Sequence, residues 1–152
     1  MRVEREQAFG VSLEEGFAFI TDPANWPRYW PGLVRVEPGS SWNASGDEAR
    51  VVTRLLGREV ELRMTLRRLE PNRVVEYDSR QRGLPDARHE RHFVPDGGGF
   101  RYRLVVEYEP RSGLRGLYDR ALVRRGVDRA LRQTLENLEA VFDARGASRR
   151  GP

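Results

Sequence analysis

The spacing of hydrophobic positions changes along the chain and predicts strands in one region and helices in others. Residues 2–9 alternate weakly between polar and apolar side chains and predict a first strand. From Leu33 to Tyr108 the period is about two residues, which indicates antiparallel strands joined by short turns. The alternation is clearest at 58–69, where nearly every second side chain is apolar. The pattern predicts about six or seven strands with one apolar face.

Two short helices are expected directly after the first strand. Ser12 stands three residues before Glu15, the spacing of a capping box, and predicts a helix that ends near Thr21. Asp22 followed by Pro23 then forms a second helix start, because proline is favoured at the first helical position.

The last apolar pattern predicts one long helix from about Ser112 to Ala144. An amphipathic helix of this length is the natural cover for the apolar face of the sheet. Gly116 and Gly126 interrupt it, each at a cost of about 1 kcal/mol relative to alanine, and suggest a packing or cavity requirement. The apolar stripe of the helix is expected to comprise Leu117, Ala121, Leu122, Val127, Leu131, Leu135, Leu138 and Phe142.

The end of the chain lacks this pattern, so residues 146–152 are expected to be a disordered basic tail behind a single domain at 1–145. All 27 basic residues are arginine, against 23 acids, which gives a net charge of +4 among 152 residues. Because Arg145, Arg149 and Arg150 lie near the end, the rest of the chain is nearly neutral. This balance argues against a nucleic-acid partner.

The amino-acid composition excludes several kinds of functional site. The chain has no cysteine, which excludes disulfides, thiolate zinc sites and cysteine nucleophiles. No apolar run approaches the length needed to cross a bilayer. We therefore expect a cytoplasmic monomer or homodimer without an integral membrane segment.

The order of strand, two short helices, strand meander and long helix resembles the helix-grip fold of the START-like superfamily. The similarity is closest to its polyketide cyclase/dehydrase and lipid-transport group, and it is carried by residues 17–30, 93–100 and 131–138. The resemblance implies an α+β fold in which a curved antiparallel sheet wraps the C-terminal helix. It also implies an apolar cavity between them for a lipid, quinone or polyketide-like ligand.

The strand at 86–94 contains an anomaly. Phe93 belongs to the apolar face, so the period of two also turns Arg91 and His89 inward. A buried arginine keeps its charge and needs an acid, carbonyl groups, water or a ligand anion. These two residues are either the polar anchors of a ligand cavity or part of a marginal strand whose Arg91 reaches solvent. The residues expected to line the cavity are Trp30, Leu62, Met64, Tyr77, His89, Arg91, Tyr102, Leu104 and Leu122.

Three functions remain open at this point. Binding or carrying a small hydrophobic or amphipathic ligand is the first. Aromatase/cyclase-type catalysis is the second, with His89, Arg91 and Tyr77 as candidate catalytic residues. The third is a protein-interaction module that uses the arginine-rich tail or the outer sheet face. His89 and His92 face opposite sides of a strand, so no metal and no cofactor is expected. Trp42 could be a rim residue of the cavity or an ordinary loop anchor.

Overall fold

Seven strands form one antiparallel sheet in the order β1-β7-β6-β5-β4-β3-β2. The computed structural model describes residues 1–55, 57–109 and 114–151, with only the backbone of 114–119. The chain follows the meander that the alternating pattern predicts, because each strand from β2 to β7 pairs with the next one. The strands are β1 (Arg2–Phe9), β2 (Leu33–Val36), β3 (Glu48–Leu55), β4 (Arg58–Glu70), β5 (Val74–Gln81), β6 (Ala87–Asp96) and β7 (Gly99–Tyr108).

The short helices after β1 start where their capping residues predict. They are α1 (Leu13–Thr21), the 3-10 helix η1 (Pro23–Asn25) and α2 (Trp26–Tyr29). The Ser12 hydroxyl accepts a hydrogen bond from the Glu15 backbone N–H at 3.2 Å, which satisfies a donor that the first turn leaves free. The Asp22 carboxylate does the same for Ala24 at 3.0 Å.

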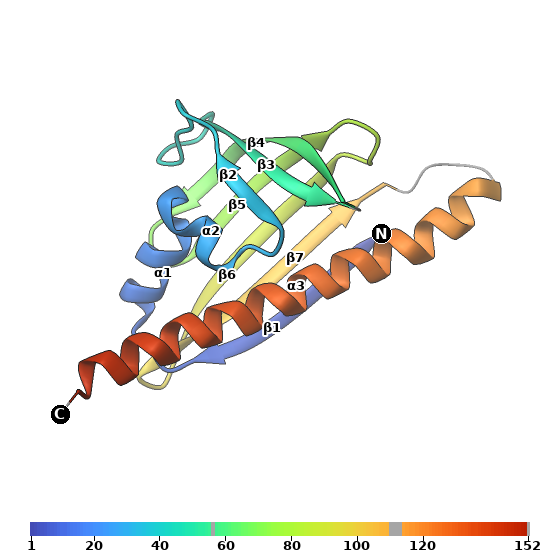
Figure 1. Cartoon of the computed structure of the whole chain (residues 1–152). Helices are drawn as coiled ribbons and strands as arrows, with labels where there is room; N and C mark the ends of the chain where they lie inside the picture. Colours follow the sequence, from blue (N-terminus) through green and yellow to red (C-terminus); the bar gives the residue numbers. More distant parts are fainter. Residues whose placement is uncertain (56, 110–113, 152) are drawn as a thin grey trace.

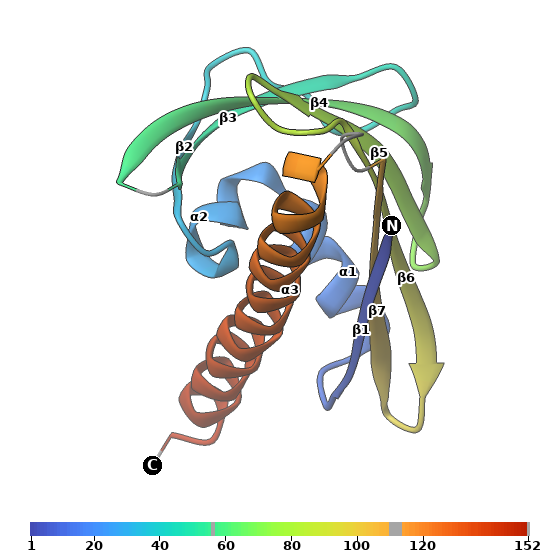
Figure 2. The ribbon, with the colours of Figure 1, turned by 90° about the vertical axis from the view of Figure 1, so that its right-hand side faces the viewer.

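Helix α3 (Leu114–Arg149) runs along β1 on the inner side of the curved sheet (Figures 1 and 2). Two contacts fix its position over this edge strand. Arg5 Nε donates to Asp128 Oδ1 at 2.6 Å, and Gln7 Nε2 donates to Glu139 Oε2 at 3.1 Å. The expected helix start at Ser112 lies outside the described residues.

The apolar stripe of α3 differs from the expected one at its beginning. Val123 and Val127 pack against the core, whereas Leu122 is 64% exposed. Successive residues of a helix point about 100° apart, so a stripe that passes through Val123 turns Leu122 away from the interior. Gly126 has no atom within 4 Å of where a Cβ would lie, so packing does not explain this glycine.

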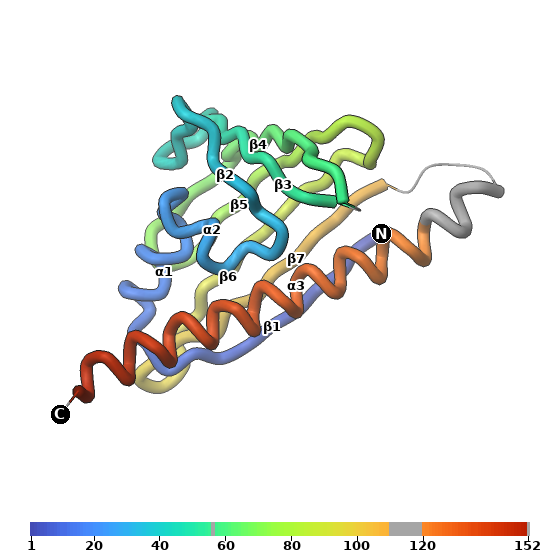
Figure 3. Tube along the Cα trace, viewed as in Figure 1, coloured from blue at the N-terminus to red at the C-terminus, as the bar shows by residue number. Residues whose placement is uncertain are grey.

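The C-terminal segment is helical up to Arg149, so the prediction of a disordered tail at 146–152 is wrong for 146–149. Arg149 makes a bidentate pair with Glu15 of α1, with N···O distances of 2.8 and 3.1 Å. Arg145 lies 3.8 Å from the same carboxylate. Figure 3 shows this end of α3 running past α1. Arginines suit the last turns of a helix because its carbonyl end carries partial negative charge.

All six phenylalanines gather in one cluster, which we call the phenyl cluster. The rings of Phe17 and Phe93 are 4.9 Å apart, and those of Phe9 and Phe142 are 5.4 Å apart. Gly16 packs so closely below Phe100 that a Cβ there would come within 2.2 Å of the ring. The cluster comprises Phe9, Phe17, Phe19, Phe93, Phe100 and Phe142 and joins α1, α3 and the sheet.

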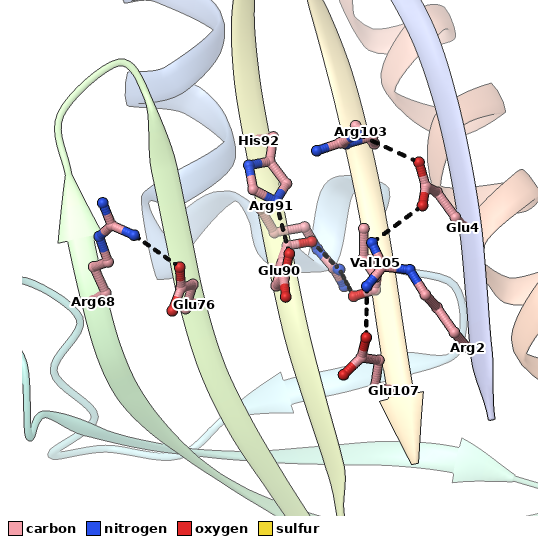
Figure 4. Close-up of polar contacts among 10 residues, drawn as sticks. All are labelled: Arg2, Glu4, Arg68, Glu76, Glu90, Arg91, His92, Arg103, Val105 and Glu107. Carbon is pink, nitrogen blue, oxygen red and sulfur yellow. Dashed lines mark hydrogen bonds and ion pairs between the residues drawn. The ribbon is translucent and has the colours of Figure 1, made fainter.

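The outer face of the sheet is charged and makes ion pairs across neighbouring strands (Figure 4). Arg2 donates to Glu107 at 2.5 Å, and Arg68 donates to Glu76 at 3.1 Å. Such exposed pairs each contribute at most about 1 kcal/mol. Among the helices in the described ranges, none is both long and apolar enough to cross a membrane.

Candidate functional site

Strands β5 and β6 place Tyr77, His89 and Arg91 side by side on the inner face of the sheet. Tyr77 lies directly opposite His89 in the strand register, and their rings stack with centroids 4.5 Å apart. The guanidinium of Arg91 bends back over this pair, with its Cζ 5.4 Å from the centre of the Tyr77 ring. We call Tyr77, Ser79, His89 and Arg91 the polar cluster.

Arg91 is held by uncharged partners. Its Nη2 donates to the Tyr77 hydroxyl at 3.0 Å. Its Nη1 donates to the carbonyl oxygens of Glu90 and Val105 at 3.1 and 3.3 Å (Figure 4). Within the described residues no carboxylate lies within 4.0 Å of the guanidinium. The guanidinium is thus directed into the protein without a counter-charge.

The charge of Arg91 is retained in this position. Burial alone would lower the pKa of Arg91, but the surrounding phenol groups of Tyr77, Tyr102 and Tyr29 outweigh it and leave the pKa above its ordinary value. A guanidinium is in any case not deprotonated in proteins. The interior therefore contains one fixed positive charge.

His89 is neutral, and its hydrogen bonds determine which ring nitrogen carries the proton. Burial first, and then the positive charge of Arg91, lower the pKa of His89 well below its ordinary value. Nδ1 lies 3.5 Å from Arg91 Nη2, which can only donate, so Nδ1 accepts. We therefore assign the proton to Nε2, which donates to Ser79 Oγ at 2.7 Å.

This direction of hydrogen bonding excludes a serine-hydrolase role for Ser79 and His89 in the observed arrangement. A catalytic histidine accepts the serine proton and is oriented by an acid on its other nitrogen. Here the serine accepts, and the other nitrogen faces a cation. Ser79 was not predicted as a site residue, although it shares the inward face of its strand with Tyr77 and could have been found by the same alternation.

One tryptophan, Trp42, contacts the polar cluster, and two more continue from it through ring contacts. The Trp42 ring is 5.3 Å from the Tyr77 ring and 5.4 Å from that of Trp26. Trp30 is partly buried and lies 5.9 Å from Trp26. Trp42 is thus packed into the interior from the loop before β3. No periodic pattern in the sequence marks this position.

The other predicted lining residues, apart from Leu122, lie on the same inner face. Leu104 is opposite Arg91 in the register between β6 and β7, and Met64 is opposite Ser79. Met64 and Leu104 are each 1% exposed, and Leu62 is buried as well. Tyr102 is 2% exposed, and burial raises the pKa of its hydroxyl. The inner face near Arg91 is therefore apolar and aromatic around a few polar groups.

Two hollows on the surface lie away from this set. One of about 510 Å³ is lined by residues that include Met1, Asp86 and Tyr108. The other, of about 460 Å³, lies against α3 at Asn137 and Arg145. Neither is lined by a member of the polar cluster. In the part of the chain that the structure describes, no three histidine, aspartate or glutamate side chains gather as metal ligands would.

A seven-stranded antiparallel sheet bent around a long C-terminal helix, with two short helices after the first strand, is the START-like helix-grip fold. The chain belongs to the polyketide cyclase/dehydrase and lipid-transport family, which it matches over residues 1–143. The fold and the family expected from the sequence are therefore confirmed.

Solved structures show the same fold at low sequence identity. The aromatase/cyclase Zhui from Streptomyces sp. R1128 is 14% identical, with a TM-score of 0.80 over 95% of this chain and 94% of that chain. The protein TTHA0849 from Thermus thermophilus is 18% identical, with a TM-score of 0.79 over 95% and 98%. A START superfamily protein from Mycobacterium smegmatis is 14% identical, with a TM-score of 0.77 over 94% and 97%. No curated protein matches the sequence.

Proposed function

We propose that this protein binds a small apolar or amphipathic ligand between the concave face of the sheet and α3. The observation that carries the proposal is the Arg91 guanidinium, which is turned into an aromatic interior with only uncharged partners in the described part of the chain. An unpaired buried charge costs several kcal/mol, so it is retained where it serves a ligand. Apolar walls with a few placed polar groups are typical of small-molecule sites.

The accessibility of these side chains also supports the proposal. Arg91 and His89 each keep some accessible surface, although burial has the largest effect on the pKa of His89. A residue that is partly accessible lies beside space that solvent or a ligand can enter. This combination fits a ligand chamber better than a solid core.

The family description names both polyketide cyclases or dehydrases and lipid transport. A lipid, a quinone or a polyketide-like compound would match the aromatic and aliphatic side chains that surround the polar cluster. We propose this class of ligand, with its polar end at Arg91.

A thermal-shift screen with lipids, quinones and polyphenols tests the proposal. A ligand at about one hundred times its Kd adds about 2.7 kcal/mol, which for a chain of this size raises Tm by about 5–10 °C. Arg91→Ala should lose most of this shift. Arg103→Ala, which removes an arginine from the outer face of β7, is the matched control and should keep it. A screen in which no apolar compound raises Tm would contradict ligand binding.

Aromatase/cyclase-type catalysis in the same place is the second candidate. It is favoured by a neutral imidazole beside a guanidinium and a phenol, which could take up a proton and polarise a carbonyl group. Both ring nitrogens of His89 are occupied in the observed arrangement, so catalysis would require Arg91 or Ser79 to release one. Consumption of a poly-β-carbonyl compound by the wild type, and its loss in a His89→Ala variant that still binds the compound, would distinguish an enzyme from a carrier.

A further inference from the structure

The hydrogen bonds of the polar cluster leave two hydroxyl hydrogens unused. Tyr77 accepts from Arg91, and Ser79 accepts from His89. Each hydroxyl has one hydrogen of its own, and neither donates it to a partner in the described residues. Both groups can therefore still donate.

Two further donors lie close by. Neither the Tyr102 hydroxyl nor the Trp42 indole N–H makes a hydrogen bond among the residues that the structure describes. No enclosed side-chain nitrogen or oxygen in that part of the chain lacks a partner, so both groups must retain accessible surface. Trp42 packs against Tyr77, and Tyr102 lies near enough to Arg91 for the guanidinium charge to act on its pKa.

Free acceptors are scarce in the same place. The His89 nitrogen that can accept is occupied by Arg91, and the Glu90 and Val105 carbonyls near the guanidinium are occupied as well. Among the described residues, no side-chain carboxylate or carboxamide forms a hydrogen bond or ion pair with the polar cluster. The interior thus offers donor hydrogens and a positive charge, and the side-chain acceptors left free there are hydroxyl oxygens rather than charged groups.

We infer that the polar end of the ligand is a carboxylate. A carboxylate only accepts hydrogen bonds, has about four lone-pair sites and supplies the negative charge that Arg91 lacks. An alcohol would leave the charge of Arg91 without a counter-charge, and an amine would bring a second positive charge. The inference rests on the proposed binding function and narrows its ligand to an apolar body with an anionic carboxylate head.

A matched series of ligands tests the head group. Saturated carboxylic acids of eight to twelve carbons and the primary alcohols of equal length are titrated into the full chain at neutral pH by isothermal calorimetry. Each acid should bind at least about tenfold more tightly than its alcohol, because hydrogen bonds to charged groups contribute more than those between neutral groups. Equal affinity of acid and alcohol in the wild type would overturn the inference and leave ligand binding intact.

Two variants test whether Arg91 is the residue that makes the protein prefer the acid over the alcohol. Arg91→Met keeps an unbranched side chain without charge, and acid and alcohol should then bind equally. Arg103→Met, on the outer face, should keep the full preference for the acid. An undiminished preference in a folded Arg91→Met variant, checked by circular dichroism, would overturn the inference. If neither acids nor alcohols bind to the wild type, the inference fails, whereas the proposed function fails only if the wider thermal-shift screen also finds no ligand, so the two failures are distinguishable.

Discussion

The phenyl cluster and the polar cluster occupy two parts of one interior and are built from the same strands. Phe93 and Arg91 lie two residues apart on β6, so both point to the inner face. Around Phe93 the rings of Phe17 and Phe100 fill the space. Around Arg91 the partners are one hydroxyl group, two carbonyl groups and a neutral imidazole. Alternation along a strand thus determines which way a side chain points, and its neighbours determine what that position does.

The two clusters also differ in what they contribute to stability. Burial of a phenylalanine side chain stabilises a fold by about 1.5–3 kcal/mol, and six such side chains gather in the phenyl cluster. Burial of a charge without a counter-ion opposes folding. We conclude that the phenyl cluster stabilises the fold, whereas the charge in the polar cluster opposes folding and would be retained for the ligand binding proposed above.

The largest expected effect lies in the phenyl cluster. Phe100 is 0% exposed, so Phe100→Ala should lower the free energy of unfolding by about 3–5 kcal/mol, since it removes packed atoms and leaves a cavity. Urea denaturation measures this loss. Arg91→Met is the comparison in the polar cluster and should cost less than about 1 kcal/mol. A larger loss for Arg91→Met than for Phe100→Ala would contradict the conclusion that the phenyl cluster is the one that stabilises the fold.

A pair of tyrosine variants sharpens the comparison within the candidate site. Tyr77→Phe removes the hydroxyl that accepts from Arg91, and it should lower the free energy of unfolding by about 1.5–3 kcal/mol. Tyr102→Phe removes a hydroxyl without a partner among the described residues, and it should change that free energy by less than about 0.5 kcal/mol. Both values come from urea denaturation. Similar losses in the two variants would show that the Arg91–Tyr77 hydrogen bond contributes nothing of its own.

The smallest expected effect is a dependence of stability on pH. In the unfolded chain His89 titrates near pH 6.5, whereas its pKa in the folded protein is well below that value. As pH falls below about 6.5 the unfolded chain binds a proton that the folded protein does not. The free energy of unfolding should therefore decrease on acidification, by at most about 1.4 kcal/mol per pH unit from this residue.

Histidine variants isolate this contribution in denaturation curves measured at several pH values. His89→Gln should flatten the slope just below about pH 6.5. His92→Gln, which alters the histidine on the outer face that bonds with Glu90, serves as the control and should leave the contribution of His89 in place. An unchanged slope in His89→Gln would mean that this imidazole is not held neutral.

Most of the fold could be predicted from the sequence because its signals are local. The alternation at 58–69 and the capping residues Ser12 and Asp22 act through neighbouring backbone, and the structure has the expected elements there. The segment at 146–149 could not be predicted in this way. In this helix Arg149 pairs with Glu15, which lies near the other end of the chain. A pattern read from neighbouring residues cannot reveal such a contact.

The candidate site shows the same limit. The inward direction of Arg91 and His89 follows from Phe93 and a period of two, as the sequence indicates. The partners of those side chains do not, because Tyr77 and Val105 meet Arg91 from two other strands. Leu122 was expected to face the interior because the apolar stripe of the helix was drawn through it. The stripe passes through Val123 instead, one residue later, and Leu122 is exposed.

The position of Phe142 has a consequence for the order of assembly during synthesis. Five of the six rings in its cluster belong to the first 100 residues, and the sixth is supplied by α3. A nascent chain can therefore complete the entire sheet while its concave side still lacks this helix. Helix α3 follows the sheet along the chain and closes the interior, so a stop codon between Tyr108 and Leu131 would yield a sheet whose apolar face lacks Leu131, Leu135, Leu138 and Phe142.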